Sequence, residues 1–558
     1  MQPRTATILL ALTLATPAIA RMTSPPASRG AAVAPIAEVD ARTLAALDTK
    51  ALLDAAEKGD RVRVGGPFVF AEARPVAFDL ESSGTWETLS DGSRLWRLLI
   101  ESPGAVNLNL AFRRFELPEG ARLWIYNKAG DYVEGPYTTR DRSQTGELWT
   151  PVVYGSQAVV ELHVPAGSTA PLALEIGQVN HGFRSISAKQ GSCNVDVVCP
   201  EGEPWRDQIR SAVRYSISGI FLCSGTLINN TAEDGKPFVL SAAHCGANTG
   251  NAGTIVTYWM FESPSCGQLA GGDPSNNQVG ATFRASHTPT DTFLYELNQT
   301  PDPDFEPYYS GWDRTGALPS GVVTIHHPSW DEKAISFDDD SLSVADVSAF
   351  GGPMVSWQTQ WDQGTTESGS SGGGLWRTSN GLLVGALWGG AASCAAPTQP
   401  DYFGPFHLAW AGGGTSSTRL SDWLDPSGSG ATTLEGLDPL SNCTVTDTAL
   451  CLNERRFKVE VAWKNFLDET GSGQRAPGGT ADSGLFYFFQ PDNLELLVKV
   501  INGCSVNGHF WILGAATTNV EYTLTITDTE TDVVRTYFNP LGKASPAIID
   551  IEAFETCP

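Results

Sequence analysis

Apolar and polar residues alternate along much of the first third of the chain, a pattern typical of β-strands. Gly, Pro and Asp separate the apolar segments, as turns between strands require. Residues 41–58 differ, because four leucines recur there at roughly helical spacing and predict a helix. Strands are predicted at residues 95–100, 106–112, 122–126 and 159–164. After an Ala-, Pro- and Ser-rich lead-in at residues 21–40, we therefore expect a small β-rich domain that ends near Val179.

Strand patterns continue through the rest of the chain. From Cys193 to about residue 437 the sequence is strand-rich and glycine-rich, and helical spacing is confined to residues 417–424. Ser417 is placed to cap that helix, and a Pro/Gly/Ser hinge follows at residues 426–430. Further strands are predicted at residues 456–463, 484–489, 494–500, 509–513 and 520–527. The expected fold class is mainly β throughout.

Length and charge narrow the class of protein. A chain of 558 residues should hold several domains. Its formal net charge of -26, from 62 acidic and 36 basic side chains, argues against nucleic acid or an anionic membrane surface as a partner. Residues 1–20 have the charge, apolar core and small-residue end of a signal peptide. No later segment has about 20 unbroken apolar residues, so we expect a secreted protein without a membrane anchor.

The cysteines agree with export. There are ten, and none precedes Cys193. Six lie from Cys193 to Cys394 and four from Cys443 to Cys557, which predicts two disulfide-stapled units after a cysteine-free leader. The sequence has no CxxC pair and no paired-histidine spacing, so we expect no metal site and no cofactor.

A glycine-flanked serine loop at residues 365–373 is the first candidate for chemistry. Serine is a poor nucleophile unless a base removes its proton, and glycines allow the unusual backbone such a site needs. Alone, a Gly/Ser segment of this kind is more often only a turn. Two other features change that balance. His244 follows an apolar strand within Ser-Ala-Ala-His-Cys, and Asp291 stands at the head of an alternating strand, where its carboxylate could orient an imidazole.

The order His, Asp, Ser, with these flanks, resembles the chymotrypsin-like serine proteases and is most similar to their bacterial lysyl endopeptidase branch. The resemblance covers about residues 193–437. It is carried by residues 191–202, the His244 motif with Cys223-Ser-Gly-Thr-Leu-Ile, Asp291, Ile325-His-His-Pro, Gly369-Ser-Ser-Gly and residues 419–426. It implies a two-β-barrel protease domain with a C-terminal helix at residues 190–437 and a β-rich propeptide at residues 21–189. Residues 438–558 are similar to β-sandwich-like accessory domains of secreted bacterial proteins.

Carried over residue by residue, the resemblance implies Ser371 as nucleophile, His244 as general base and Asp291 as its orienter. The N–H groups of Gly369 and Ser371 would form the oxyanion hole. Ser370 stands where trypsin-like enzymes carry the aspartate that pairs with a freed N-terminus, a departure that the lysyl endopeptidases share. We therefore expect activation to depend on removal of the leader rather than on an N-terminal ion pair. The implied disulfides are Cys193–Cys394, Cys199–Cys266 and Cys223–Cys245, and the pairing of the other four cysteines stays open.

The primary specificity pocket is also implied by the resemblance. Asp401 matches the acidic residue at the base of that pocket, and a buried carboxylate gains strongly from a cationic substrate side chain. This predicts cleavage after Lys or Arg. Trp388, followed by Gly389, stands where the lysine-selective enzymes carry a histidine, so the balance between Lys and Arg is left open.

A basic connector at residues 181–190 precedes the cysteine-rich block and is expected to be exposed. An ordinary linker would look the same, but Lys189 lies four residues before Cys193, so we predict self-cleavage between Lys189 and Gln190. The propeptide is then expected to act as an intramolecular inhibitor and chaperone of a monomeric enzyme.

Two alternatives lie in other classes. A non-catalytic binding or adhesion protein could use the same fold, but it would not need a complete triad and a pocket acid. An esterase is disfavoured, because the loop around Ser371 does not fit the Gly-x-Ser-x-Gly elbow in a strand–turn–helix context.

Overall fold

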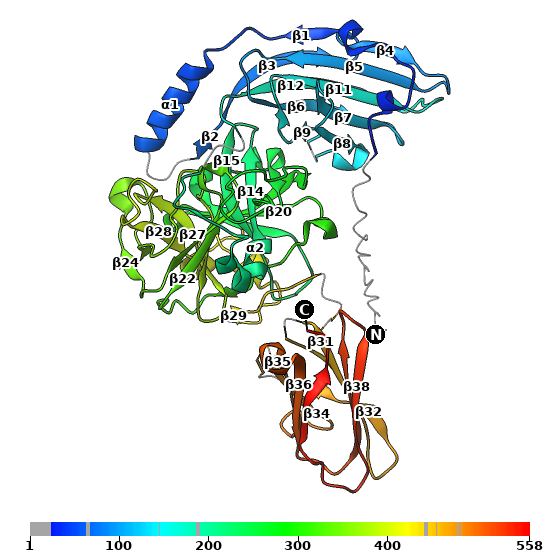
Figure 1. Ribbon diagram of the computed structural model, residues 1–558, viewed down its shortest axis with the longest axis vertical. Helices are drawn as coiled ribbons and strands as arrows, with labels where there is room; N and C mark the ends of the chain where they lie inside the picture. Colours follow the sequence, from blue (N-terminus) through cyan, green and yellow to red (C-terminus); the bar gives the residue numbers. More distant parts are fainter. Residues whose placement is uncertain are drawn as a thin grey trace, which may run out of the picture. The chain divides into compact units, whose positions relative to one another are not determined.

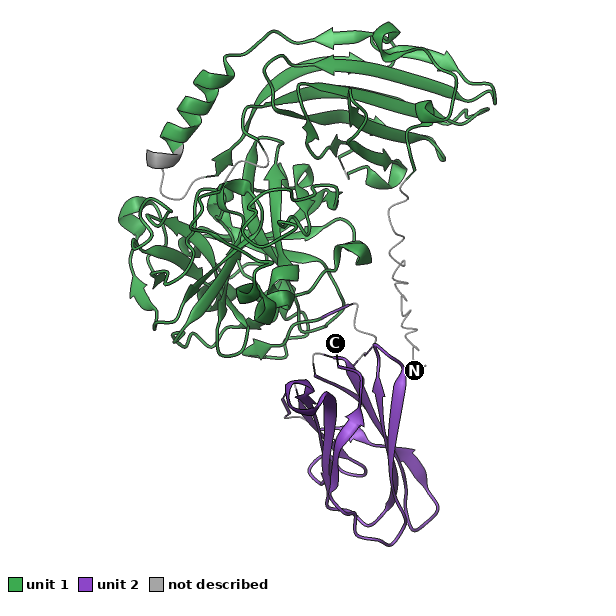
Figure 2. Cartoon of the chain, viewed as in Figure 1, with its two compact units in different colours: residues 1–437 green, residues 438–558 purple. Residues whose placement is uncertain are grey.

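The computed structural model describes residues 24–62, 67–143, 145–185, 190–439, 443, 445–453, 455–476, 479–480 and 482–557. The predicted signal peptide and the predicted cleavage residue Lys189 lie outside these residues. The chain divides into two compact units, residues 1–437 and 438–558 (Figure 2). Figure 1 follows the elements from the blue leader through the green central strands to the red C-terminal strands. The predicted mainly β class is confirmed.

The leader region, residues 24–185, consists of two sheets around one core. In the first sheet the order is β1-β5-β11-β7-β8, with β4 beside β5, and in the second it is β10-β6-β12-β3, with β9 beside β6. Side chains such as Leu98, Leu110 and Val160 are completely buried between the sheets, as alternating strands with one apolar face require. The bounds are β1 (Ala41–Thr43), β3 (Ala71–Asp79), β4 (Thr85–Thr88), β5 (Arg94–Glu101), β6 (Asn107–Glu116), β7 (Arg122–Asn127), β8 (Val133–Tyr137), β9 (Leu148–Trp149), β10 (Val153–Tyr154), β11 (Gln157–Val164) and β12 (Ala173–Gly182).

The helix predicted at residues 41–58 is wrong in its first half. Residues 41–43 form β1, which pairs in parallel with β5, and the helix α1 spans Thr49–Val62. Its start is set by Asp48, whose Oδ1 accepts the Ala51 N–H at 3.0 Å and whose carbonyl accepts the Leu52 N–H. Leucine spacing predicted the helix but could not locate this cap.

In the part of the connector that the structure describes, residues 181–184 and Gln190 are buried, contrary to the predicted exposure, and Ser185 is exposed. His181 still belongs to β12 and is buried, with its ring nitrogens 2.8 Å from Ser102 Oγ and 3.1 Å from Thr49 Oγ1. Arg184 is also buried, and its guanidinium lies 4.1 Å from the centre of the Phe68 ring. Polar residues there are buried because the leader itself supplies their partners.

The central region, residues 190–437, contains two further sheets. The first has the order β18-β17-β14-β15-β16-β20-β19, and β2 of the leader adds an eighth strand by pairing with β15. The second has the order β13-β23-β22-β26-β27-β28-β25-β24, with β21 beside β27 and β29 beside β21. The bounds in the first sheet are β2 (Phe68–Val69), β14 (Ala212–Ile217), β15 (Phe221–Ile228), β16 (Phe238–Ala242), β17 (Val256–Tyr258), β18 (Asn277–Val279), β19 (Ala281–His287) and β20 (Thr292–Leu297).

The second sheet is built from ten strands. It carries the serine loop, which leads into β26, and Asp401, the first residue of β28. The bounds are β13 (Val195–Asp196), β21 (Trp312–Asp313), β22 (Val322–His326), β23 (Ala334–Asp338), β24 (Ser343–Ala345), β25 (Ser356–Thr359), β26 (Gly374–Arg377), β27 (Leu383–Gly390), β28 (Asp401–Pro405) and β29 (Thr433–Leu434). One apolar cluster joins both sheets: Leu240 and Leu294 of the first contact a core that includes Ile325 and Leu383 of the second.

Helix is scarce in the central region. The helix predicted at residues 417–424 is shorter, because residues 415–418 form a turn in which the Thr418 N–H donates to the Thr415 carbonyl at 2.8 Å. The helices are α2 (Arg206–Ser211), α3 (Phe406–Ala411) and α4 (Ser421–Leu424). Leu420 and Leu424 are buried in the cluster that joins the two sheets, so the apolar face predicted for this segment is present although most of the helix is not.

The C-terminal unit is a pair of five-stranded sheets around a single core. Its orders are β30-β31-β37-β38, with β32 beside β31, and β33-β34-β35-β36-β39. Two disulfides settle the pairing that the sequence left open, Cys443–Cys451 and Cys504–Cys557. The elements are β30 (Ala449–Leu452), β31 (Phe457–Lys464), β32 (Thr470–Ser472), β33 (Gln474–Arg475), β34 (Ser483–Tyr487), β35 (Leu494–Gly503), α5 (Cys504–Asn507), β36 (His509–Ala516), β37 (Glu521–Asp528), β38 (Val533–Asn539) and β39 (Ile548–Phe554).

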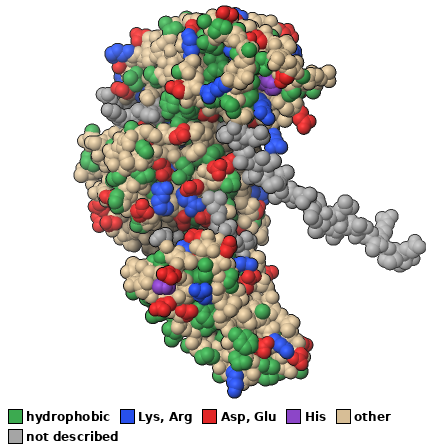
Figure 3. All heavy atoms as spheres, turned by 45° about the vertical axis from the view of Figure 1, so that its right-hand side comes forward, with side chains coloured by type: hydrophobic (Ala, Val, Ile, Leu, Met, Phe, Trp, Pro, Cys, Tyr) green, Lys and Arg blue, Asp and Glu red, His purple; other side chains and the backbone are tan. Residues whose placement is uncertain are grey.

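Charged side chains are spread over the surface. Figure 3 shows acidic and basic residues interspersed on the visible face rather than gathered into one basic patch. Within the described part of the chain, no helix combines the length and the apolar character needed to cross a membrane.

Candidate active site

His244 and Asp291 are brought together by the ends of two adjacent strands. His244 lies in a short 3-10 turn (Ala243–Cys245) directly after β16, and Asp291 directly precedes β20, the neighbour of β16 in the sheet. The His244 Nδ1–H donates to Asp291 Oδ2 at 2.6 Å, and the backbone N–H of His244 donates to Oδ1 at 2.8 Å. Asp291 has φ 50°, a left-handed conformation that aspartate tolerates better than most residues. The carboxylate thus fixes both the tautomer and the position of the ring.

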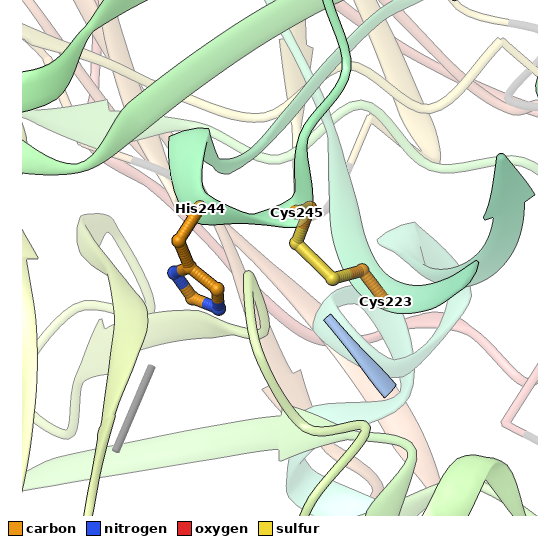
Figure 4. A group of neighbouring side chains, drawn as sticks. All are labelled: Cys223, His244 and Cys245. Atoms are coloured by element: carbon orange, nitrogen blue, oxygen red, sulfur yellow. A yellow bond between two sulfur atoms is a disulfide. The ribbon is translucent and has the colours of Figure 1, made fainter. Parts of the chain in front are cut away.

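The other ring nitrogen of His244 is open. Its Nε2 is buried and has no hydrogen-bond partner among the described residues. Figure 4 shows the ring projecting from the same turn as Cys245, which a disulfide ties to Cys223 of β15. A strand end and a disulfide therefore hold an imidazole whose Nε2 has no hydrogen-bond partner among the described residues.

Two groups of side chains in the described residues are close enough to share a metal ion. One is Cys223, His244 and Cys245, but both sulfurs belong to the disulfide and offer no thiolate. The other is Asp338 with Asp340 and Asp362, of which the last two are exposed. Asp338 Oδ2 already accepts hydrogen bonds from Thr359 and Gln360. Neither group is therefore a good candidate for a metal site.

Ser371 lies in a loop whose glycines are sterically required. The residue is 8% exposed, and its carbonyl accepts the Ser224 N–H at 2.8 Å. Gly372 has φ 82°, and a Cβ there would come within 2.1 Å of Ser241 Oγ. Gly369 has φ 97°, and a Cβ there would come within 2.7 Å of the backbone nitrogen of Trp330. The loop can approach both neighbouring segments only because it has no side chains at these two positions.

The amides of the loop differ in their partners. The Ser370, Gly372 and Gly373 N–H groups donate to backbone carbonyls. Among the described residues, the Gly369 and Ser371 N–H groups have no acceptor. These are the two amides for which the sequence resemblance implies a role in the oxyanion hole.

Ser370 is held by a histidine that the sequence did not single out for a role. It is fully buried, and its Oγ lies 2.7 Å from His326 Nδ1 and accepts the Glu367 N–H at 3.1 Å. Burial lowers the pKa of His326 to about 3, so this histidine is neutral. An uncharged contact thus braces the loop at the position where trypsin-like enzymes carry an aspartate.

Asp401 is the buried acid of the second sheet. It is 0% exposed and pairs with Gly390 in the ladder between β28 and β27. Burial raises the pKa of its carboxyl, while hydrogen bonds from Thr366 and Trp361 act in the opposite direction. Trp388 is 2% exposed and sits at a register shift in β27, followed by Gly389 with φ 149°. Asp401, Trp388 and Gly389 thus lie on two paired strands, and Thr366 ties the acid to the serine loop.

The first described residue after the predicted cleavage bond is also anchored. The Gln190 N–H donates to Asp331 Oδ2 at 2.6 Å. Asp331 and Glu332 are both fully buried, and burial, followed by the neighbouring Glu332 carboxyl, raises the pKa of Asp331 to about 9. The same segment meets the serine loop, since the Ser329 N–H donates to the Ser368 carbonyl at 2.7 Å. No motif around Asp331 in the sequence predicts a role for its side chain.

The disulfides of the central region are the three pairs that the resemblance implies. They join Cys193 to Cys394, Cys199 to Cys266 and Cys223 to Cys245. The first ties the start of the central region to the segment between β27 and β28, and so braces the strands that carry Asp401.

Two family descriptions match the chain. Residues 35–183 match the lysyl endopeptidase N-terminal domain, and residues 187–404 match the lysyl endopeptidase C-terminal domain. A lysyl endopeptidase of Pseudomonas aeruginosa is 30% identical over 356 residues, which cover 58% of this chain and 74% of the relative.

A solved structure, the crystal structure of Deg5, is similar over 36% of this chain and 86% of its own, with 12% identity and a TM-score of 0.24. That likeness is too weak to carry an argument. The two matched domains and the extent of the Pseudomonas relative decide the assignment. The chain belongs to the lysyl endopeptidase family of serine proteases.

Proposed function

We propose that this chain is a secreted serine endopeptidase that cleaves peptide bonds after basic residues, made as a proenzyme. The observation that carries the proposal is the His244–Asp291 pair, whose Nε2 is open, together with the buried carboxylate of Asp401. The name of the Pseudomonas relative, lysyl endopeptidase, supports Lys as the favoured residue before the cleaved bond.

The chemistry assigned to each residue follows from its surroundings. Ser371 Oγ attacks the carbonyl carbon as its proton passes to His244 Nε2, and Asp291 stabilises the resulting imidazolium. The Gly369 and Ser371 N–H groups bind the oxyanion. When the tetrahedral intermediate collapses, His244 gives the proton to the leaving amine. Water then repeats the sequence on the acyl-enzyme, giving the carboxylate product and restoring Ser371.

The same proposal includes the domain plan. The two central sheets would be the two β-barrels of a chymotrypsin-like domain at residues 190–437, after a signal peptide at 1–20 and a propeptide at 21–189. Residues 438–558 would be an accessory domain of β-sandwich type. The five disulfides suit an oxidising, extracellular compartment.

The leader would act as inhibitor and folding aid through its contacts with the central region. β2 extends the first central sheet, and the Phe70 ring stacks on Trp330 with centroids 5.4 Å apart. The backbone nitrogen of Trp330 is the atom that a side chain at Gly369 would meet. Removal of the leader would therefore free the segment around Trp330, which contacts the serine loop.

Self-processing after Lys189 can be tested on secreted protein. N-terminal sequencing of the wild type should give a chain that begins at Gln190, and Ser371→Ala, made in a protease-free host, should stay uncut. Trimming of the alanine variant at the same bond would exclude self-processing.

Digestion of a mixed peptide library tests the function itself. The processed enzyme should cut after Lys, with Arg second, and Ser371→Ala should not cut. Asp401→Asn should lose the preference for basic residues. Cleavage spread over non-basic residues in the wild type would contradict the role of Asp401, and absence of cleavage would favour a non-catalytic binding protein on this fold.

A further inference from the structure

The two oxygens of the Asp401 carboxylate have different partners. Oδ2 accepts a hydrogen bond from Trp361 Nε1 and another from Thr366 Oγ1, each at 2.7 Å. Oδ1 is buried and has no hydrogen-bond partner among the described residues. Trp361 follows β25 and Thr366 lies at the start of the serine loop, so two residues of the connection between β25 and β26 hold the same oxygen.

The Oδ1 side of the Asp401 carboxylate faces Gly390 of the neighbouring strand. Gly390 lies opposite Asp401 in the ladder, and a Cβ at Gly390 would come within 2.1 Å of Oδ1. Gly390 itself is half-buried, whereas Asp401 is completely buried. Glycine at this position therefore places no side chain of its own against Oδ1, the oxygen that lacks a hydrogen-bond donor among the described residues.

An acid with one open oxygen distinguishes the two basic side chains. Lys presents a single ammonium, which pairs well with one oxygen. Arg presents a planar fork of N–H groups and gains most from two parallel hydrogen bonds to both oxygens of a carboxylate. With Oδ2 occupied, the second of these bonds has no acceptor, and a buried guanidinium N–H is left unpaired, which is costly.

We propose that Trp361 and Thr366 are specificity-determining residues that make the pocket selective for Lys over Arg by occupying Asp401 Oδ2. The proposal rests on the proposed role of Asp401 as the pocket acid. It concerns the balance between Lys and Arg, which the sequence left open at Trp388. A purely structural role would also satisfy Oδ2, but that role predicts equal losses for both substrates.

The test compares variants of the processed enzyme, each with its C-terminal unit, on two peptides that differ only in Lys or Arg before the cleaved bond. Thr366→Val removes the hydroxyl donor with little change of shape, and Trp361→Phe removes the indole donor. Each should lower the Lys/Arg ratio of kcat/KM, by about tenfold for loss of one charge-assisted hydrogen bond. Thr366→Ser, which keeps the donor, should retain most of the wild-type ratio.

Trp357→Phe is the matched control for loss of packing. Trp357 is buried in the same apolar cluster as Trp361, but its Nε1 donates to the Val384 carbonyl at 3.2 Å instead of Asp401. Its Lys/Arg ratio should equal that of the wild type. If Trp361→Phe does not fold, Thr366→Val and Thr366→Ser still decide the question.

A Lys/Arg ratio that is unchanged, or that shifts further toward Lys, in Thr366→Val would overturn the inference. Asp401→Asn separates this failure from a failure of the proposed function. If Asp401→Asn keeps a preference for basic residues, the pocket assignment itself is wrong. If it loses that preference while the Thr366 variants share the wild-type ratio, only the specificity role is wrong.

Discussion

At the scale of single residues, both carboxylate oxygens of Asp291 accept hydrogen bonds from His244. One oxygen holds the ring and the other holds the backbone N–H of the same residue. Asp291→Asn would replace one acceptor with an NH2 donor and favour the wrong tautomer of the imidazole. We expect kcat to fall by about four orders of magnitude, as loss of this tautomer does in Ser-His-Asp enzymes generally.

Steady-state hydrolysis of a chromogenic Lys substrate by processed enzyme checks this expectation. The melting temperature of the variant serves as the control for folding. Among the described residues, no other carboxylate lies within hydrogen-bond distance of His244 Nδ1, so none could replace Asp291 in the variant. A fall in kcat of less than about tenfold would therefore contradict the role of Asp291 as the orienting acid.

Sequence analysis could single out those residues whose neighbours also carry a signal. His244, Asp291 and the Ser371 loop each have distinctive flanks, and the structure places His244 against Asp291. Trp361, Thr366 and His326 act through contacts formed only when distant strands meet, such as the 2.7 Å bond between Trp361 and Asp401. No spacing along the chain encodes such a contact, so the pattern could not assign these side chains a role.

At the scale of elements, the segment at residues 327–332 joins three parts of the fold. Phe70 of the leader stacks on Trp330, Gln190 donates to Asp331, and Ser329 donates to the serine loop. Ser329 and Trp330 both have positive φ, at 53° and 58°, which is strained for residues with a side chain. The three contacts link this strained segment to the leader, to Gln190 and to the serine loop.

The buried acid in this segment predicts a pH dependence for the uncut proenzyme. Burial raises the pKa of Asp331 to about 9 from the usual 3.8, so the folded state binds this proton more tightly than the unfolded chain. The contribution to the free energy of unfolding is then complete below about pH 4 and is lost as pH rises toward about 9. Denaturant unfolding of Ser371→Ala protein at several pH values measures it.

Asp331→Asn in the Ser371→Ala background is the matched variant. Because asparagine does not ionise, the free energy of unfolding should vary less between about pH 5 and about pH 8 than it does with Asp331. Identical pH slopes in the two proteins would show that Asp331 titrates as it does in the unfolded chain.

The strands were predicted well and the helices poorly, for a physical reason. Segments such as residues 95–100 and 159–164 lie in β5 and β11, because alternation is written locally along each strand. Residues 41–43 and 417–420 resembled helix by their spacing, yet pairing with β5 and a turn at Thr415 outweighed it. Helical propensity is a weak local preference that such contacts override.

At the scale of the whole molecule, the boundary between the two units predicts which truncations are tolerated. Leu437 exchanges two backbone hydrogen bonds with Tyr309, at 2.8 and 2.9 Å, and is buried in the core of the first central sheet. The C-terminal unit has a core of its own. A chain ending at Asp438 should hydrolyse peptides with kcat/KM within about twofold of the full chain, since no core residue of the first unit is lost.

A chain ending at Asp425 is the informative comparison. It removes β29, which pairs with β21, as well as Leu437. We expect it to be secreted poorly or to melt at lower temperature, because two backbone pairings and a buried side chain are lost. Equal stability of the two truncated chains would contradict the boundary.

The central claim is that Ser371 is acylated by substrates whose basic side chain reaches Asp401. The most direct measurement is intact-mass and peptide-map analysis of processed enzyme treated with a diaryl phosphonate that carries a lysine side chain. We predict one adduct per chain, located on Ser371, absent from Ser371→Ala and greatly slowed in Asp401→Asn. Processed wild-type enzyme that forms no adduct, or forms it at another residue, would contradict the account.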